Sequence, residues 1–206
     1  MRFICEHHGV HKISIIAHSW GTMATGLFAG RCAELVRRLV FFAPIAWRQK
    51  QAEPQIYPAW RLVTLREQWE RFTQDVPSGE RAVLNRQDFD EWGERYLDTD
   101  AESRTRSPPS VKIPSGPWQD IVWAWAGQLP YAPANIRAPV GILRGEWDQA
   151  STDDDAGWLF NALKSSPLRR VVKIGRATHL MHLESGRFAP YREAETFLNG
   201  NDPPGK

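Results

Sequence analysis

Three residue types that together can activate a hydroxyl group occur in this chain in the order serine, aspartate, histidine, at Ser19, Asp148 and His179. A serine hydroxyl is a weak nucleophile near neutral pH, so it needs a base to take its proton, and the base needs a carboxylate to orient it. Each of the three follows a short apolar run that we expect to be a strand. Because parallel strands place their carboxyl ends at one edge of a sheet, the sequence predicts nucleophilic catalysis at that edge.

The surroundings of Ser19 favour an exposed nucleophile. The serine lies between the β-branched run 12–17 and the run 23–31, which is rich in Ala, Leu, Met and Phe and has helical composition. Small residues, Ala17 and Gly21, stand two positions before and after it. In a sharp strand–turn–helix connection, small neighbours relieve crowding around a strained serine. The alternative is a serine that only caps the helix.

The candidate for the orienting carboxylate is Asp148, which follows the expected strand 138–143. Glu146 lies two residues earlier and is the competing acid. We favour Asp148 because it lies further from the end of the strand. A purely structural role for Asp148, as a helix cap or turn residue, is the remaining alternative.

The candidate base is His179, the first histidine after the expected strand 168–174. His182 follows three residues later and would share its direction if the loop began a helical turn. We favour His179 and expect His182 and Glu184 to pack behind it.

The composition sets limits on the class of protein. The 206 residues are 42% hydrophobic and 24% charged, with a formal net charge of +2, which is enough apolar material for one cored domain. So small a charge gives no electrostatic reason to expect binding to nucleic acid or to an anionic membrane. Cys5 and Cys32 cannot form a disulfide framework, and we find no leader peptide or membrane-spanning run. We therefore expect a cytoplasmic protein.

The chain is expected to have an α/β fold with a mostly parallel sheet that is interrupted by an insertion. We divide it into a first core part at 1–44, an insertion at 45–134, a second core part at 135–199, and a Gly/Pro-rich tail at 200–206 that should fray.

The insertion contains most of the tryptophans and shows no alternating strand pattern, so we expect it to be all-helical. The tryptophans could form an apolar lid over a substrate or could only pack the insertion onto the sheet. Arg61, Arg66 and Arg71 should lie on a solvated helix face. The expected helices are 58–72, 86–97 and 118–128, with a polar linker at 101–117.

Three motifs resemble those of the α/β-hydrolase superfamily, of the kind with a helical cap between the sixth and seventh strands. They are Ala17-His-Ser-Trp-Gly21, Gly145-Glu-Trp-Asp148 and Ala177-Thr-His-Leu-Met-His-Leu-Glu184. The family commonly has Gly-His-x-x-His-Leu-Glu in the last motif, and Thr178 replaces the glycine here. The resemblance covers 12–43 and 138–198.

The resemblance implies a mechanism in which Ser19 attacks a carbonyl, His179 moves the proton and Asp148 holds the imidazole. It implies a small-molecule carboxylic ester or related acyl substrate and no cofactor or metal. The main-chain N–H of Trp20 would supply half of an oxyanion hole. A serine nucleophile argues against haloalkane dehalogenases and most epoxide hydrolases. The residues expected around the oxyanion and substrate pocket are Trp20, His18, Trp147 and His182.

The family also has strands before the nucleophile strand, whereas this sequence begins only a short distance ahead of it. We therefore expect run 12–17 to have an unpaired edge that favours self-association. A truncated, inactive fragment or a binding module is the alternative to an enzyme. His8-Gly9 resembles an oxyanion dipeptide, but we interpret 2–11 as the end of a helix that stops at Gly9.

A second chemical interpretation concerns the first residues of the chain. Cys5, His7, His8 and His11 are close in sequence and could be taken for metal ligands. Gly9 interrupts the helical face shared by two of the histidines, and no second pair with zinc-ligand spacing follows. The sequence therefore does not predict a metal site.

Overall fold

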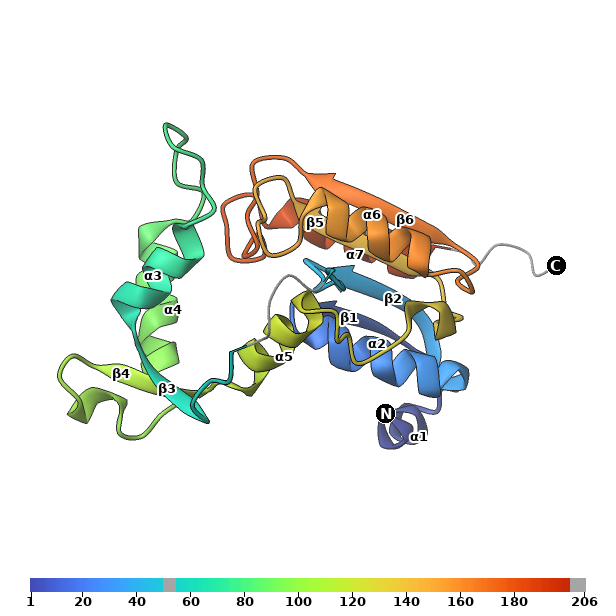
Figure 1. Cartoon of the computed structure of the whole chain (residues 1–206), viewed down its shortest axis with the longest axis horizontal. Helices are drawn as coiled ribbons and strands as arrows, with labels where there is room; N and C mark the ends of the chain where they lie inside the picture. The colour runs from blue at the N-terminus through green and yellow to red at the C-terminus, as the bar shows by residue number, and fades with distance from the viewer. Residues whose placement is uncertain (50–54, 201–206) are drawn as a thin grey trace.

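A four-stranded parallel sheet forms the core of the protein (Figure 1). The computed structural model describes residues 1–49 and 55–200. The strands lie in the order β1 (Ile13–His18), β2 (Val36–Phe42), β5 (Val140–Gly145) and β6 (Arg169–Ile174). All three pairings are parallel, so the four carboxyl ends share one edge. The predicted α/β fold with a mostly parallel sheet is confirmed.

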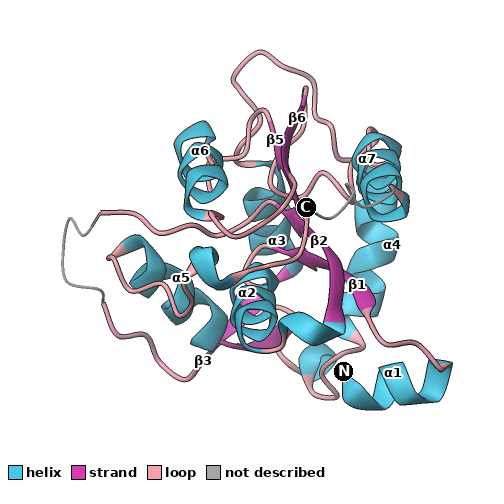
Figure 2. Ribbon diagram, turned by 90° about the vertical axis from the view of Figure 1, so that its right-hand side faces the viewer, coloured by secondary structure: helices cyan, strands magenta, loops and turns pink. Residues whose placement is uncertain are grey.

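Helices cover both faces of the sheet because alternate residues of β2 point to opposite sides. Leu39 and Phe41 pack with α2 (Gly21–Arg31) and α6 (Asp153–Ala162). Their neighbours Val40 and Phe42 pack with α7 (Phe188–Asn199) on the other face. Figure 2 shows α6 and α7 on opposite sides of β5 and β6. This double burial explains the continuous apolar run Leu39–Phe42 in the second half of β2.

The insertion lies between β2 and β5 in the chain and forms most of a lobe beside the core (Figure 1). It contains α3 (Leu65–Thr73), α4 (Arg86–Leu97) and α5 (Gly116–Trp125). It also contains an antiparallel pair of strands, β3 (Trp60–Thr64) and β4 (Ser110–Pro114). The prediction of an all-helical insertion is therefore wrong. The segment expected to be one helix at 58–72 is part strand, and the expected linker contains the partner strand.

A local signal for the true start of α3 is present in the sequence. Thr64 and Glu67 form a capping box, in which the Thr64 side chain accepts from the Glu67 N–H and the Glu67 carboxylate accepts from the Thr64 N–H. The pattern Thr-x-x-Glu marks a helix beginning at Leu65. The residues before it were therefore free to join a strand. Short 3₁₀ helices occur at Ala33–Leu35, Ser103–Thr105 and Pro133–Asn135.

The first helix and the first strand lie at one border of the sheet. α1 (Arg2–His8) ends at Gly9, whose φ of 63° is left-handed, which confirms the predicted glycine stop. β1 pairs with β2 alone among the described strands, and Ile16 on it is 56% exposed. The geometry agrees with the expected open edge, and self-association through it stays a prediction.

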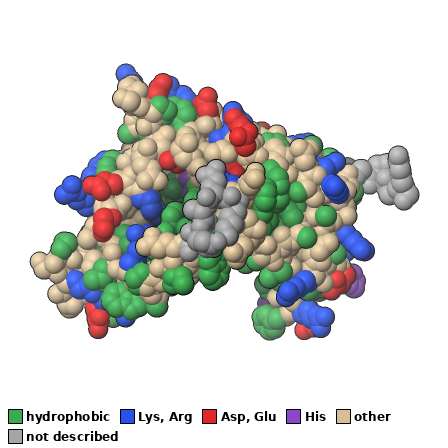
Figure 3. All heavy atoms as spheres, viewed as in Figure 1, with side chains coloured by type: hydrophobic (Ala, Val, Ile, Leu, Met, Phe, Trp, Pro, Cys, Tyr) green, Lys and Arg blue, Asp and Glu red, His purple; other side chains and the backbone are tan. Residues whose placement is uncertain are grey.

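Charged side chains of both signs are interspersed on the face shown in Figure 3. Among the described helices, none is both long and apolar enough to cross a membrane. Residues 1–49 and 55–200 also contain no group of three or more His, Cys, Asp or Glu side chains placed to hold a metal ion. The end of the expected tail, 201–206, lies outside the described residues.

Candidate active site

Ser19 occupies the turn between β1 and α2. Its φ of 52° is left-handed, as the strand–turn–helix interpretation predicts for a strained serine. Hydrogen bonds hold the turn: the Ser19 N–H donates to the Phe42 carbonyl at 2.9 Å, and the Thr22 hydroxyl and N–H donate to the Ser19 carbonyl at 2.6 and 2.9 Å. The explanation given for Gly21 is wrong, because a Cβ there would meet no atom within 4 Å.

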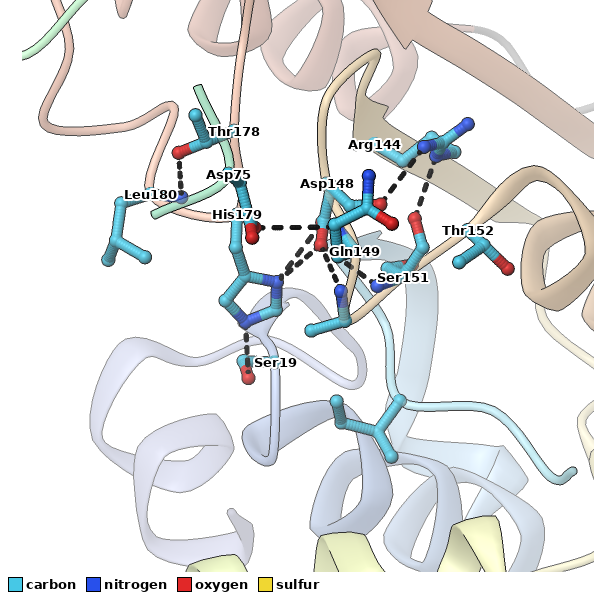
Figure 4. Close-up of polar contacts among 12 residues, drawn as sticks. Ser19, Asp75, Arg144, Asp148, Gln149, Ser151, Thr152, Thr178, His179 and Leu180 are labelled. Carbon is cyan, nitrogen blue, oxygen red and sulfur yellow. Dashed lines mark hydrogen bonds and ion pairs between the residues drawn. The ribbon is translucent and has the colours of Figure 1, made fainter. Parts of the chain in front are cut away.

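The structure brings the three predicted chemical groups together at the carboxyl edge of the sheet (Figure 4). The Ser19 Oγ lies 2.7 Å from His179 Nε2. On the other side of the ring, His179 Nδ1 lies 3.0 Å from each carboxylate oxygen of Asp148. With the proton on Nδ1, this nitrogen donates to the carboxylate and Nε2 is free to accept the serine proton.

Asp148 is only 1% exposed, and the protein surrounds its carboxylate with donors. The N–H groups of Ala150 and Ser151 donate to Oδ1 at 2.9 and 2.8 Å. Several donors hold a buried carboxylate in one orientation. Asp148 can therefore orient the His179 ring.

Arg144, which the sequence analysis did not single out, supports the loop that carries Asp148. Its side chain is buried and donates to the carbonyls of Ser151 at 2.8 Å and Asp148 at 3.2 Å (Figure 4). It also pairs with Asp153 at the start of α6. One guanidinium thus joins the end of β5 to the next helix. Its position inside an apolar strand run was the available signal, since a buried arginine needs partners.

The two competing residues occupy other positions. The Glu146 carboxylate is directed to the loop after β6, where it accepts from the Arg176 N–H at 2.9 Å. His182 does not reach Ser19; its ring packs 4.5 Å from the ring of His18. Glu184 is buried and accepts from the main chain and the hydroxyl of Thr178, next to His179. The structure thus places His179 beside Ser19 and Asp148 on the far side of the His179 ring, and neither competitor takes these positions.

His18 and His182 form a second layer behind His179. The His18 Nε2 lies 3.0 Å from the His179 carbonyl, to which it donates, and its ring also contacts Phe42. Burial, together with the neighbouring His179 and His182, lowers the pKa of His18 to about 3. Burial likewise lowers the pKa of His182 to about 4. Both rings are therefore neutral near pH 7 and pack as uncharged supports of the His179 loop.

These neutral histidines should make stability depend on pH. His18 has an ordinary pKa of 6.5 when unfolded and about 3 when folded, so below pH 6.5 the unfolded chain takes up a proton that the folded chain does not. The contribution of His18 to the free energy of unfolding is therefore fully present above pH 6.5. As the pH drops below this value, the free energy of unfolding falls by up to about 1.4 kcal/mol per pH unit for this group. Urea titrations at pH 7 and pH 5 measure the fall, and His18→Gln should make it shallower. An unchanged slope in that variant would contradict the neutral assignment.

The loops that carry Asp148 and His179 touch at Gly145. A Cβ on this glycine would lie 2.3 Å from the Ala177 carbonyl oxygen and 2.6 Å from that of Thr178. Both are backbone atoms, so any larger residue must displace the loop that holds His179. Gly145 is what allows the acid and the base to come from adjacent strands and still meet.

Gly145→Ala should lower the free energy of unfolding by about 1–3 kcal/mol, the usual range for overpacking. It should also lower turnover, because the backbone shift reaches His179. Gly157→Ala is the matched control: it lies inside α6, where an added Cβ meets no atom within 4 Å, and should be neutral or stabilising. Urea denaturation and initial rates check both variants. Equal stability of the two would show that the contact at Gly145 relaxes without strain.

The hydroxyl of Ser19 opens onto a cavity of about 240 Å³ between the core and the insertion. Ser19, His179 and Leu180 contribute from the core edge, and α5 contributes Trp118 and Trp125. Two tryptophans of the insertion therefore line the cavity, while Trp69 and Trp92 pack among phenylalanines within the insertion. The positions of Trp118 and Trp125 agree with the lid interpretation, which stays a prediction, whereas Trp69 and Trp92 have a packing role.

Two of the expected pocket residues lie elsewhere. The Trp20 side chain lines a neighbouring cavity of about 220 Å³, and its indole N–H donates to Asp120 on α5 at 2.8 Å. The Trp20 side chain is therefore not part of the Ser19 cavity lining. Trp147 is not among the residues that line the Ser19 cavity, and its ring lies beneath the Arg176 guanidinium at 5.7 Å.

Asp75, just beyond α3, is a titratable residue of the cavity that the sequence analysis missed. Its carboxylate accepts from the Gln149 N–H at 3.4 Å and so connects the insertion to the loop of Asp148 (Figure 4). Burial, with a further contribution from Asp148, raises the pKa of Asp75. No local pattern in the sequence marks this residue, because its proximity to the site arises only from the packing of the insertion.

Comparison with known proteins identifies the family. A model of the alpha/beta hydrolase fold matches residues 1–186. Because this match covers most of the chain, the protein belongs to the α/β-hydrolase fold family. A comparison with curated protein sequences finds no match.

Solved structures share the fold at low sequence identity. An α/β hydrolase, MGS-M2, from a Medee basin deep-sea metagenome library is 14% identical, with a TM-score of 0.53 over 100% of this chain and 71% of its own. A monoacylglycerol lipase from Paleococcus ferrophilus is 18% identical, with a TM-score of 0.53 over 96% of this chain and 72% of its own. The 2-hydroxy-6-oxo-6-phenylhexa-2,4-dienoate hydrolase from Rhodococcus sp. strain RHA1 is 18% identical, with a TM-score of 0.56 over 94% of this chain and 66% of its own.

Proposed function

We propose that this protein is a serine hydrolase that cleaves a carboxylic ester or a related acyl bond through Ser19, His179 and Asp148. One observation carries the proposal: a continuous hydrogen-bonded path runs from the Ser19 Oγ through both nitrogens of His179 to the buried Asp148 carboxylate. Serine, base and orienting acid in this order are the parts that acyl transfer to a hydroxyl requires.

The chemistry follows from the positions of these atoms. The Ser19 Oγ attacks the carbonyl carbon while His179 Nε2 takes the hydroxyl proton, and the Asp148 carboxylate stabilises the resulting imidazolium. The Trp20 N–H, at the start of α2, is the local donor for the oxyanion. His179 then gives its proton to the leaving alcohol, and an acyl-serine remains. Water, deprotonated by the same imidazole, releases the carboxylic acid.

The cavity favours a small or medium substrate. Its volume of about 240 Å³ lies below the range of roughly 300–1,000 Å³ that suits drug-sized ligands. Its apolar lining includes Ile45, Ile121 and Trp125, which would bury a short hydrocarbon part of the acyl or alcohol group. We therefore expect turnover of p-nitrophenyl esters to be highest for short acyl chains.

A fluorophosphonate probe tests the proposal because it labels an activated serine and ignores an inert one. The folded 206-residue chain should be labelled, and Ser19→Ala should not be. Ser14→Ala is the matched control: it removes a buried hydroxyl without a hydrogen-bond partner from β1, the strand that precedes Ser19, and should leave labelling intact. A folded chain that takes up no label would favour the alternative of a non-catalytic binding module.

A further inference from the structure

We propose that Arg71 selects substrates that carry a carboxylate in addition to the acyl bond cleaved at Ser19. The inference rests on the proposed function, since it names the substrate class of the same cavity. Arg71 lies in the last turn of α3 and lines the cavity into which the Ser19 hydroxyl and the His179 ring open. Arg71 is exposed, as expected for the face shared with Arg61 and Arg66, and it also lines this cavity.

The guanidinium of Arg71 has no carboxylate partner among residues 1–49 and 55–200. Its Nε–H donates to the side-chain oxygen of Gln68 at 2.9 Å, and Gln68 is itself buried, so one N–H of the guanidinium is held on the helix side. By contrast, Arg66 on the same helix pairs with Glu70 at 2.9 Å. The terminal N–H groups of Arg71 are therefore free to bind an anion.

The surroundings of Arg71 disfavour its positive charge, and a bound anion would compensate for this. Partial burial lowers the pKa of Arg71, and the nearby charge of Arg61 acts in the same direction. An arginine nevertheless stays protonated at neutral pH, so the cavity wall holds an uncompensated positive charge. This charge is close enough to the nucleophile turn to contribute to the lowered pKa of His18.

Asp75 is the other charged residue of the insertion in the cavity, and it does not neutralise Arg71. No ion pair joins the two side chains. The Asp75 carboxylate is instead directed to the Gln149 N–H, near Asp148 and His179. The two charged residues that the insertion places in the cavity wall are thus not paired with each other.

The cavity therefore offers apolar walls, a nucleophile and one fork of free N–H donors. A planar guanidinium binds a carboxylate through two parallel hydrogen bonds, which a neutral ester group cannot reproduce. A substrate in which a short hydrocarbon chain joins the acyl bond to a carboxylate matches all three features. Charge-assisted hydrogen bonds of this kind correspond to a preference of about tenfold or more.

Two ester pairs test the inference. Mono-p-nitrophenyl adipate carries the carboxylate on the acyl side, and 4-(carboxymethyl)phenyl hexanoate carries it on the alcohol side; each is compared with its neutral methyl ester. For at least one pair, kcat/KM of the unchanged protein should be about tenfold or more higher for the anionic ester. Arg71→Gln should reduce this ratio to near one. Arg66→Gln, on the same helix but outside the cavity, should keep it. No preference in either pair, or a preference that persists in Arg71→Gln, would overturn the inference.

Binding to the Ser19→Ala variant separates this inference from the proposed function, because binding needs no turnover. Calorimetry should show that Ser19→Ala binds the preferred anionic ester about tenfold more tightly than the methyl ester, and that adding Arg71→Gln removes the difference. Equal affinities of Ser19→Ala for the anionic ester and the methyl ester would contradict the inference, even if the unchanged protein hydrolyses neutral esters. Binding that depends on Arg71, in a chain that shows no turnover, would support the inference and refute the proposed function.

Discussion

Replacing His179 by alanine should lower kcat for ester hydrolysis by about 10⁶-fold. His179 is the described side chain that contacts both the Ser19 Oγ, at 2.7 Å, and the Asp148 carboxylate, at 3.0 Å. Without the imidazole, the serine hydroxyl must lose its proton directly to water, and the leaving alcohol has no acid to protonate it. Initial rates on a p-nitrophenyl ester, with circular dichroism to verify folding, measure the effect.

His182→Gln provides the control for this variant. His182 lies three residues further along the same loop and packs against His18 rather than against Ser19. Its replacement should cost less than about tenfold in kcat, since it acts only through packing. A loss in His182→Gln as large as the loss in His179→Ala would mean that the base had been assigned to the wrong histidine.

Asp148→Asn should lower kcat by about 10⁴-fold while leaving the chain folded. The asparagine oxygen can still accept from the N–H groups of Ala150 and Ser151, which now bond to Oδ1 of the aspartate. Its amide nitrogen would then donate to His179 Nδ1 and force the ring proton onto Nε2. That tautomer cannot accept a proton from Ser19. The side chains therefore keep their positions, but proton transfer from the serine to the imidazole is lost.

Glu146→Gln is the matched control for Asp148→Asn because it makes the same chemical change two residues earlier. Its carboxylate contacts the main chain at Arg176 and not His179. We expect kcat to change by less than about threefold, in line with a substitution away from the reacting atoms. Comparison of the kcat values of the two variants distinguishes the acid of the site from its sequence competitor. A large loss in Glu146→Gln alone would transfer the role of the acid to Glu146.

The insertion shows where sequence analysis failed and why. Trp60–Thr64 is a strand because it pairs with Ser110–Pro114, almost fifty residues away. No property of either segment alone specifies that pairing, and Leu and Arg in the first segment favour a helix when considered locally. The helix α4, by contrast, was predicted with its bounds because its pattern and its Asn85 cap are local.

The same distinction applies to the candidate site. That Ser19 lies in a strand–turn–helix connection follows from a β-branched run, a small-residue motif and a helical run, all within about twenty residues. Whether Asp148 or Glu146 serves the histidine depends on how one loop turns after β5. The sequence allowed a preference between them, and Gly145 with its contacts to the next loop decided the geometry.

By itself, the amino-acid sequence determined the α/β class, the strands of the core and the order of serine, acid and base, because periodicity and turn chemistry act between near neighbours. Only the tertiary structure decided which side chains enter the cavity from the insertion. Arg71 and Asp75 follow no local rule that would separate them from other charged residues of their segment. They line the same cavity as Ser19 because the insertion packs against the carboxyl edge of the sheet, and that contact joins residues distant in the chain.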